Sequence, residues 1–106
     1  MLDQSMGFLI SPSPRVLVVD GSRLVRRLIA DVLKRRLPQV EVIGCSSLAE
    51  AGAVLEQGPV DLVTTALSLD DGDGLALARM VRAQAGQRYV PVICLLYTSP
   101  SPRDTR

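Results

Sequence analysis

The sequence predicts an α/β domain in which one parallel sheet has helices packed on both of its faces. Four short apolar segments, at residues 15–19, 40–44, 60–67 and 90–96, alternate with three segments that carry the periodicity of amphipathic helices. The first apolar segment, Val-Leu-Val-Val, has no polar alternation, as expected of a strand covered on both sides. Strands that alternate with helices through short connections form right-handed βαβ units. The length of 106 residues leaves room for one domain.

The first strand is predicted at residues 15–19 and is followed directly by the first helix. Asp20, Gly21 and Ser22 end the strand, because short polar residues and glycine favour turns. Ser22 can serve as the N-cap of the helix, and Pro38 closes it. The apolar positions expected to face the sheet are Leu24, Val25, Leu28, Ile29, Val32, Leu33 and Leu37.

The second and third helices have recognisable boundaries. Ser47 and Glu50 have the Ser-x-x-Glu spacing in which side chains and backbone amides cap each other, and this helix should end at Gly58. The third helix is predicted to start around residues 71–73 and to end at Gly86. The positions expected to face the sheet are Leu75, Ala78 and Val81, with Leu77 as a further candidate.

We expect function to lie in residues 61–74, a strand that runs into an acidic loop punctuated by glycines. The strand should end near Leu67, because it is rich in β-branched residues and turn formers follow it. Residues just beyond the carboxyl end of such a strand face the crevice in which open α/β sheets place their chemistry. Ala66 occupies the last inward position of the strand. Its methyl group can do no acid, base or nucleophilic work.

The composition excludes several classes of function. Hydrophobic residues make up 47% and charged residues 22% of the chain, which is typical of a soluble globular domain. The chain has no histidine, so histidine-dependent catalytic triads and zinc sites are excluded. Cys45 and Cys94 lie in apolar strand segments and are expected to be buried free thiols. The net charge of +1 is too small to attract nucleic acid or an anionic membrane without a local patch.

The two ends of the chain lack the pattern of the rest. Residues 1–14 are predicted to be a disordered leader without the features of a signal peptide, so a cytoplasmic location is expected. The longest apolar run, at residues 90–97, is far shorter than the roughly 20 residues that span a membrane. Residues 97–106 are predicted to be a disordered tail or non-native sequence, since residues 94–104 resemble the translation of a sequencing adaptor. The folded domain is therefore predicted at residues 15–96.

The order and spacing of these motifs resemble the receiver domain of two-component response regulators. The resemblance rests on a first strand that ends in an acidic residue, on a third strand followed by an Asp-Gly-closed loop, and on the fourth strand. These segments are residues 16–22, 61–74 and 90–93. The resemblance implies a flavodoxin-like fold with strand order 2-1-3-4-5. It covers about four of the five βα units, so the last βα unit is expected to be missing.

In that family, two adjacent acids after the first strand and an aspartate at the end of the third hold one Mg²⁺. The last carboxylate attacks a phosphoryl donor. The resemblance places Asp20 at the first acid, but it places Gly21 at the second acid and Ala66 at the phosphoacceptor, and Leu96 where a phosphate-sensing threonine or serine is expected. We therefore expect no catalytic residue and weak or absent Mg²⁺ binding, with Asp20 as at most a weak metal contact. Asp20 could instead accept backbone amides near the start of the first helix.

No neighbouring acid is expected to replace the phosphoacceptor. Asp61 belongs to the opposite end of the third strand, about 16 Å away at roughly 3.3 Å per residue. The acids of the following loop are expected to cap helices and form turns, and they are Asp70, Asp71 and Asp73.

Half of the twelve basic residues fall on the first helix. They form either a solvated helix face or a docking surface for an acidic partner, because clustered charge steers association. The docking candidates are Arg23, Arg26 and Arg27, and the other three basic residues are Lys34, Arg35 and Arg36. Nucleic acid is not an expected partner, since no recognition helix follows.

The sequence therefore predicts a phosphorylation-independent receiver module that binds other signalling proteins and is not an enzyme. One alternative is the regulatory receiver domain of a larger response regulator whose output domain, an enzyme or a DNA-binding domain, is absent from this chain. Another alternative is a flavodoxin-like enzyme that binds a nucleotide or flavin. Against that enzyme, the loop after the first strand has too few glycines to cradle phosphates.

Overall fold

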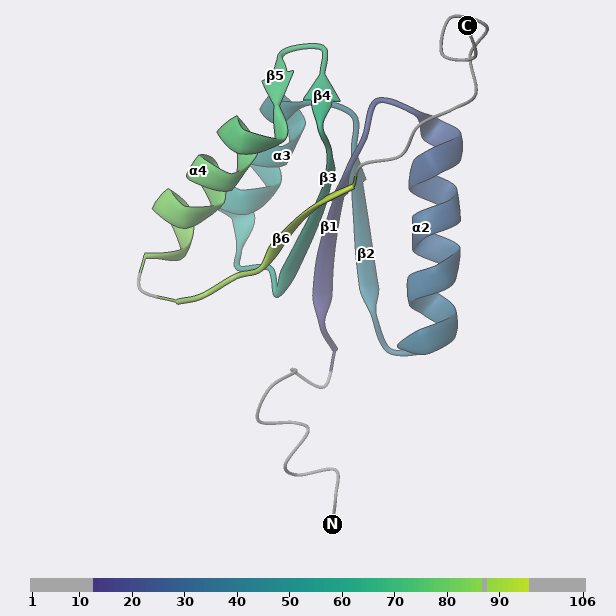
Figure 1. Ribbon diagram of the computed structural model, residues 1–106. Coiled ribbons are helices and arrows are strands. Elements are labelled where there is room, and N and C mark those ends of the chain that lie inside the picture. The colour runs from purple at the N-terminus through teal and green to yellow at the C-terminus, as the bar shows by residue number, and fades with distance from the viewer. Residues whose placement is uncertain (1–12, 87, 96–106) are drawn as a thin grey trace, which may run out of the picture.

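The computed structural model describes residues 13–86 and 88–95 as a parallel sheet with helices on both faces (Figure 1). The four parallel strands have the order β2-β1-β3-β6, and a small antiparallel hairpin lies beyond the end of β3. In chain order the elements are β1 (Arg15–Val19), α2 (Arg23–Arg36), β2 (Glu41–Cys45), α3 (Leu48–Gln57), β3 (Leu62–Ala66), β4 (Ser68–Leu69), β5 (Gly72–Asp73), α4 (Gly74–Ala85) and β6 (Val92–Leu95).

Each face of the sheet contributes its own part of the core. α2 lies on one face, and α3 and α4 lie together on the other (Figure 1). On the α2 face, Val16 and Val18 of β1 pack with Ile29 and Leu33 of α2. The larger core, on the opposite face, is built from Leu17, Val19, Cys45, Ala51, Leu55, Val60, Val63, Leu77 and Val81. Successive residues of β1 thus enter opposite cores, which explains its unbroken apolar sequence.

The predicted strand order is confirmed over the described residues, because the fourth strand of the sequence pattern, β6, lies beside β3. The strand boundaries differ from the prediction by one or two residues. β2 begins at Glu41 because the N–H of Val40 donates to the Leu37 carbonyl at 2.9 Å and closes the turn after α2. β6 begins at Val92, one residue after Pro91, which has no N–H to give to a ladder.

Helix capping follows the sequence signals with one difference. The Ser22 hydroxyl accepts from the Val25 N–H at 3.3 Å, and the Ser47 hydroxyl accepts from the Glu50 N–H at 3.2 Å. The Glu50 carboxylate, however, accepts from the N–H of Ser46 at 2.7 Å and not from that of Ser47. In a capping box Glu50 would accept from the N–H of the N-cap residue itself, Ser47. Here it accepts from the N–H one residue earlier.

The apolar stripe predicted on α2 is only partly buried. Ile29 and Leu33 pack on the sheet, but Leu24, Leu28 and Val32 are 67%, 55% and 52% exposed. The expectation that all of them face the sheet is therefore wrong for these three positions. They are four residues apart and so form one exposed row along the helix.

The two cysteines differ in their surroundings. Cys45 is buried as predicted, and burial raises the pKa of its thiol above the ordinary value. Cys94 is exposed, and the prediction of a buried thiol is wrong there. The reason is the position of β6 at the edge of the sheet, where one side of the strand has no described neighbour. Within the described part of the chain, no helix combines the length and apolarity needed to cross a membrane.

The start of α4 approaches the end of β3 so closely that a side chain at position 74 would be crowded. A Cβ on Gly74 would lie 3.1 Å from the Ala66 carbonyl oxygen and 3.2 Å from the Cys94 sulfur. Gly74→Ala should therefore lower the free energy of unfolding by about 1–3 kcal/mol, as overpacking does. Gly21→Ala is the matched control, because a Cβ there meets no atom within 4 Å, and it should change stability by less than about 0.5 kcal/mol. Urea unfolding of dilute protein compares the two, and equal losses would contradict the packing argument.

Candidate functional site

The candidate site lies at the carboxyl edge of β1 and β3, the two central strands. Val19 of β1 is in register with Thr65 of β3, so Asp20 and Ala66 follow at neighbouring positions on this edge. Asp20 is 3% exposed and Ala66 is 7% exposed, whereas Gly21 faces solvent. The structure thus brings together the three positions that the sequence singled out.

The carboxylate of Asp20 helps to turn the chain into α2. Its Oδ1 accepts a hydrogen bond from the Ser22 N–H at 2.8 Å, and its own N–H donates to the Cys45 carbonyl at 3.0 Å. The prediction that Asp20 accepts a backbone amide near the start of the first helix is confirmed. A carboxylate used in this way favours the tight turn that N-terminal helix caps need.

The residues present do not fit the magnesium ion that the resemblance implies. Mg²⁺ requires hard oxygen ligands in near-octahedral geometry. Asp20 supplies one carboxylate, whereas Gly21 has no side chain and Ala66 has only a methyl group. Among the residues that the structure describes, no three acids, cysteines or histidines gather as a possible metal site.

The three arginines at the start of α2 are placed differently from one another. Arg26 is half-buried, and its Nη1 donates to the Asp20 carbonyl at 2.7 Å. Its Cδ also lies 3.5 Å from the point that a Cβ would occupy at Gly44, so its stem crosses the end of β2. Arg23 and Arg27 are exposed. Arg26 is thus engaged in the structure of the site, and docking through these arginines stays a prediction.

Asp61 lies at the opposite edge of the sheet, as the sequence predicts. Its Oδ2 accepts from the Arg15 N–H at 2.8 Å, and its Oδ1 accepts from Arg88 Nη2 at 2.9 Å. These bonds tie the beginning of β1 to the beginning of β3. Asp61 therefore cannot stand in for a carboxylate at Ala66.

The three acids of the loop after β3 have separate surroundings. Asp73 caps α4 by accepting from the Ala76 N–H at 2.8 Å, as predicted. Asp71 instead caps α3, where it accepts from the N–H groups of Leu48 at 2.8 Å and Ala49 at 3.1 Å. The hydrogen bond from Leu48 lowers the pKa of the Asp71 carboxyl below its ordinary value. Asp70 is exposed in the same turn.

Sequence reasoning missed the β4–β5 hairpin and the bonds from Asp71 to α3. The hairpin pairs Ser68 with Asp73 and Leu69 with Gly72, in a stretch read only as a loop. Two paired residues per strand are too few to leave a periodic pattern in a sequence.

A family model for the response regulator receiver domain matches residues 16–103 of this chain. The chain belongs to this family. The resemblance of the sequence to receiver domains is thereby confirmed, and so is the flavodoxin-like fold over the strands that the structure describes.

Solved receiver structures share this fold. The chemotaxis response regulator CheY4 of Vibrio cholerae superposes with a TM-score of 0.69 at 23% identity, over 87% of this chain and 74% of that one. The receiver domain of the hybrid histidine kinase CckA superposes with a TM-score of 0.64 at 29% identity, over 74% of this chain and 70% of that one. The chain therefore shares its fold with a chemotaxis response regulator and with the receiver domain of a hybrid histidine kinase.

Curated relatives of this receiver are much longer proteins. A protein-glutamate methylesterase/protein-glutamine glutaminase of Nocardioides sp. is 37% identical over 84 residues, which are 77% of this chain and 22% of that protein. A protein with the same name from Agrobacterium fabrum is 41% identical over 86 residues, which are 79% of this chain and 23% of that protein. The chain thus spans less than a quarter of the length of these relatives, and it matches a receiver domain only.

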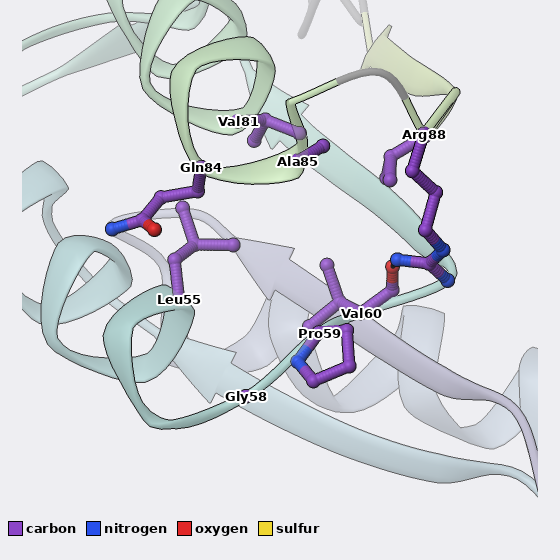
Figure 2. A pocket seen from close by; sticks show the side chains of 9 residues that line it. Leu55, Gly58, Pro59, Val60, Val81, Gln84, Ala85 and Arg88 are labelled. Atoms are coloured by element: carbon purple, nitrogen blue, oxygen red, sulfur yellow. Dashed lines mark hydrogen bonds between the residues drawn. The ribbon is translucent and has the colours of Figure 1, made fainter.

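A pocket of about 250 Å³ lies at the other end of the sheet (Figure 2). It opens between the ends of α3 and α4, and its residues are Leu55, Gly58, Pro59, Val60, Val81, Gln84, Ala85, Arg88 and Val90. Arg88, its one charged residue, donates to the Val60 carbonyl at 3.0 Å as well as to Asp61. None of the residues that line it is an acid or a nucleophile. Asp20, Gly21 and Ala66 are not among its lining residues, so the pocket is separate from the site at Ala66.

Proposed function

We propose that this receiver acts without phosphorylation, through contacts with other signalling proteins. The observation that carries the proposal is Ala66, which ends β3 beside Asp20 at the position where the family places its phosphoacceptor aspartate. A methyl group has no lone pair with which to attack a phosphoryl donor. The step that defines a phosphorylated receiver therefore has no nucleophile at this position.

The surroundings of Ala66 support the same proposal. Of the three positions Asp20, Gly21 and Ala66, only Asp20 carries a carboxylate, and one of its oxygens already accepts from the Ser22 N–H. The charge of a phosphoryl group would thus lack the metal ion that normally offsets it. Asp61 is bonded at the far edge, and Asp71 and Asp73 are bonded to helix amides. None of these acids is placed to act as a substitute.

The same proposal assigns binding of partners to exposed parts of the surface. Arg23 and Arg27 lie in the first turns of α2, near the carboxyl edge of the sheet, and both side chains are exposed. An acidic signalling protein or an attached output domain would be favoured by their charge. We propose a cytoplasmic location and no binding of nucleic acid through this domain.

A second candidate function is the regulatory domain of a longer response regulator. The relatives named above are protein-glutamate methylesterases/protein-glutamine glutaminases, and this chain corresponds to less than a quarter of each. The coding sequence that follows Leu96 in the source genome distinguishes the candidates. A methylesterase domain there would assign the chain to a regulatory role, and a stop codon soon after the receiver would favour a free-standing module.

Beryllofluoride, a mimic of a phosphoryl group, tests phosphorylation independence. The MaeR response regulator has been solved with beryllium trifluoride bound and serves as the positive control. With Mg²⁺, fluoride and beryllium present, ¹⁹F NMR should give a protein-bound resonance for MaeR and none for this chain. A bound resonance that disappears when Mg²⁺ is removed would contradict the proposal.

A further inference from the structure

The loop that follows Ala66 is fastened at its tip to a helix from an earlier part of the chain. The tip is the turn of the β4–β5 hairpin, and Asp71 lies in that turn. Its two carboxylate oxygens accept from two consecutive amides of α3, Oδ1 from Leu48 and Oδ2 from Ala49. One side chain thus bonds two amides that lie 23 and 22 residues earlier in the sequence.

These bonds supply something that α3 needs. The first amides of a helix have no partner within the helix and must find one elsewhere. At the start of α3, the Ser47 hydroxyl accepts from the Glu50 N–H, and Asp71 accepts from the two amides that remain before it. A carboxylate at this end is also favoured by the helix dipole. The cap of α3 is therefore shared between its own N-cap residue and the hairpin.

The hairpin and α3 are also packed together. Gly72 lies so close to Leu48 that a Cβ at position 72 would collide with the Leu48 side chain. Leu69 of β4 and Leu48 of α3 both pack against the same core cluster. The polar bonds of Asp71 and this apolar contact hold the hairpin at the same place on α3.

We propose that Asp71 clasps the β4–β5 hairpin to α3, so that the loop after Ala66 is held in one position by the protein itself. The inference rests on the proposed function, since in a phosphorylated receiver the phosphoryl group would also influence the position of this loop. In this chain the two hydrogen bonds of Asp71 hold the loop in the same position at all times. Asp71 is a positioning residue, and it acts through the amides of Leu48 and Ala49.

Hydrogen–deuterium exchange of the full chain, followed by mass spectrometry, tests the clasp. Two peptides matter: residues 46–52 at the start of α3, and residues 67–75 across the hairpin. Asp71→Ala should speed exchange in both peptides, by roughly fivefold at the start of α3, the size of effect that loss of an N-cap has. Asp71→Asn keeps one neutral acceptor and should give an intermediate effect. A peptide from β1 should be unchanged and reports that the fold is intact.

Two matched controls separate the clasp from simpler explanations. Asp70→Ala removes an exposed acid from the same turn and should leave both peptides unchanged. Ser47→Ala removes the other part of the α3 cap and should speed exchange in the α3 peptide alone. If Asp71→Ala also affected only the α3 peptide, Asp71 would be a plain helix cap and the inference would be overturned. Unchanged exchange in both peptides would overturn it too, and neither result would touch the absence of a phosphoacceptor at Ala66.

Discussion

Expressed alone, the 106-residue chain is expected to self-associate through β6. This strand is the edge of the sheet over the described residues, and its sequence, Val-Ile-Cys-Leu, carries no charge to block pairing. Ile93 is 46% exposed on this strand, and the exposed row of Leu24, Leu28 and Val32 on α2 adds further apolar surface. Covering even 300 Å² of such surface would contribute about 7.5 kcal/mol at roughly 25 cal/mol per Å², before the entropic cost of association is subtracted.

Sedimentation of the chain at several concentrations measures this association. Ile93→Lys should shift the protein toward monomer, because a charge on an edge strand opposes pairing. Tyr89→Lys is the control, since Tyr89 is 84% exposed but lies outside β6, and it should leave the association unchanged. A chain extended by a fifth strand and helix from a receiver relative should be monomeric and unfold cooperatively in urea. A monomeric parent chain with a sharp unfolding transition would contradict this prediction.

Restoring the missing acids is expected to restore Mg²⁺ binding in two unequal steps. Ala66→Asp alone should restore little, because the ion then has two carboxylates. Addition of Gly21→Asp should tighten Mg²⁺ binding by at least about tenfold, since one more carboxylate about 4 Å from a divalent ion contributes on the order of 2 kcal/mol even in water. The site can accept the second change, because a Cβ at Gly21 meets no atom within 4 Å.

Calorimetric titration of Mg²⁺ into the single and double variants compares the two steps. The double variant should also lose some stability without the ion, because three carboxylates at one edge repel each other. Gly21→Asn in the Ala66→Asp background is the control, since it fills the same space without the charge. Equal Mg²⁺ affinity for the Ala66→Asp variant with and without Gly21→Asp would count against this account of the site.

The central part of the site could be predicted from the sequence because its determinants are local. Ser22 and Asp73 cap the helices that directly follow them, and each bond spans three residues. The positions of Asp20 and Ala66 could be located because Asp20 directly follows an unbroken apolar strand and Ala66 ends a strand rich in β-branched residues. In a parallel sheet, the ends of adjacent strands meet at one edge, so their proximity followed from the strand order.

The features that escaped prediction depend on partners far away in the sequence. Asp71 follows the same pattern of turn residues as Asp70, and only the position of α3 gives it a different role. Likewise, the helical period of α2 identifies an apolar stripe but cannot tell how many elements will cover it. Leu28 and Cys94 are therefore exposed although their sequence context is apolar.

The most direct test of phosphorylation independence is the intact mass of the chain after incubation with acetyl phosphate and Mg²⁺. An aspartyl phosphate would add the mass of one phosphoryl group; it would form only when Mg²⁺ is present, and it would be lost in base. Because Ala66 offers no nucleophile, the parent chain should keep its mass, under conditions in which an intact receiver with its phosphoacceptor gains the phosphoryl group. A base-labile adduct that forms on this chain only with Mg²⁺ would contradict the account.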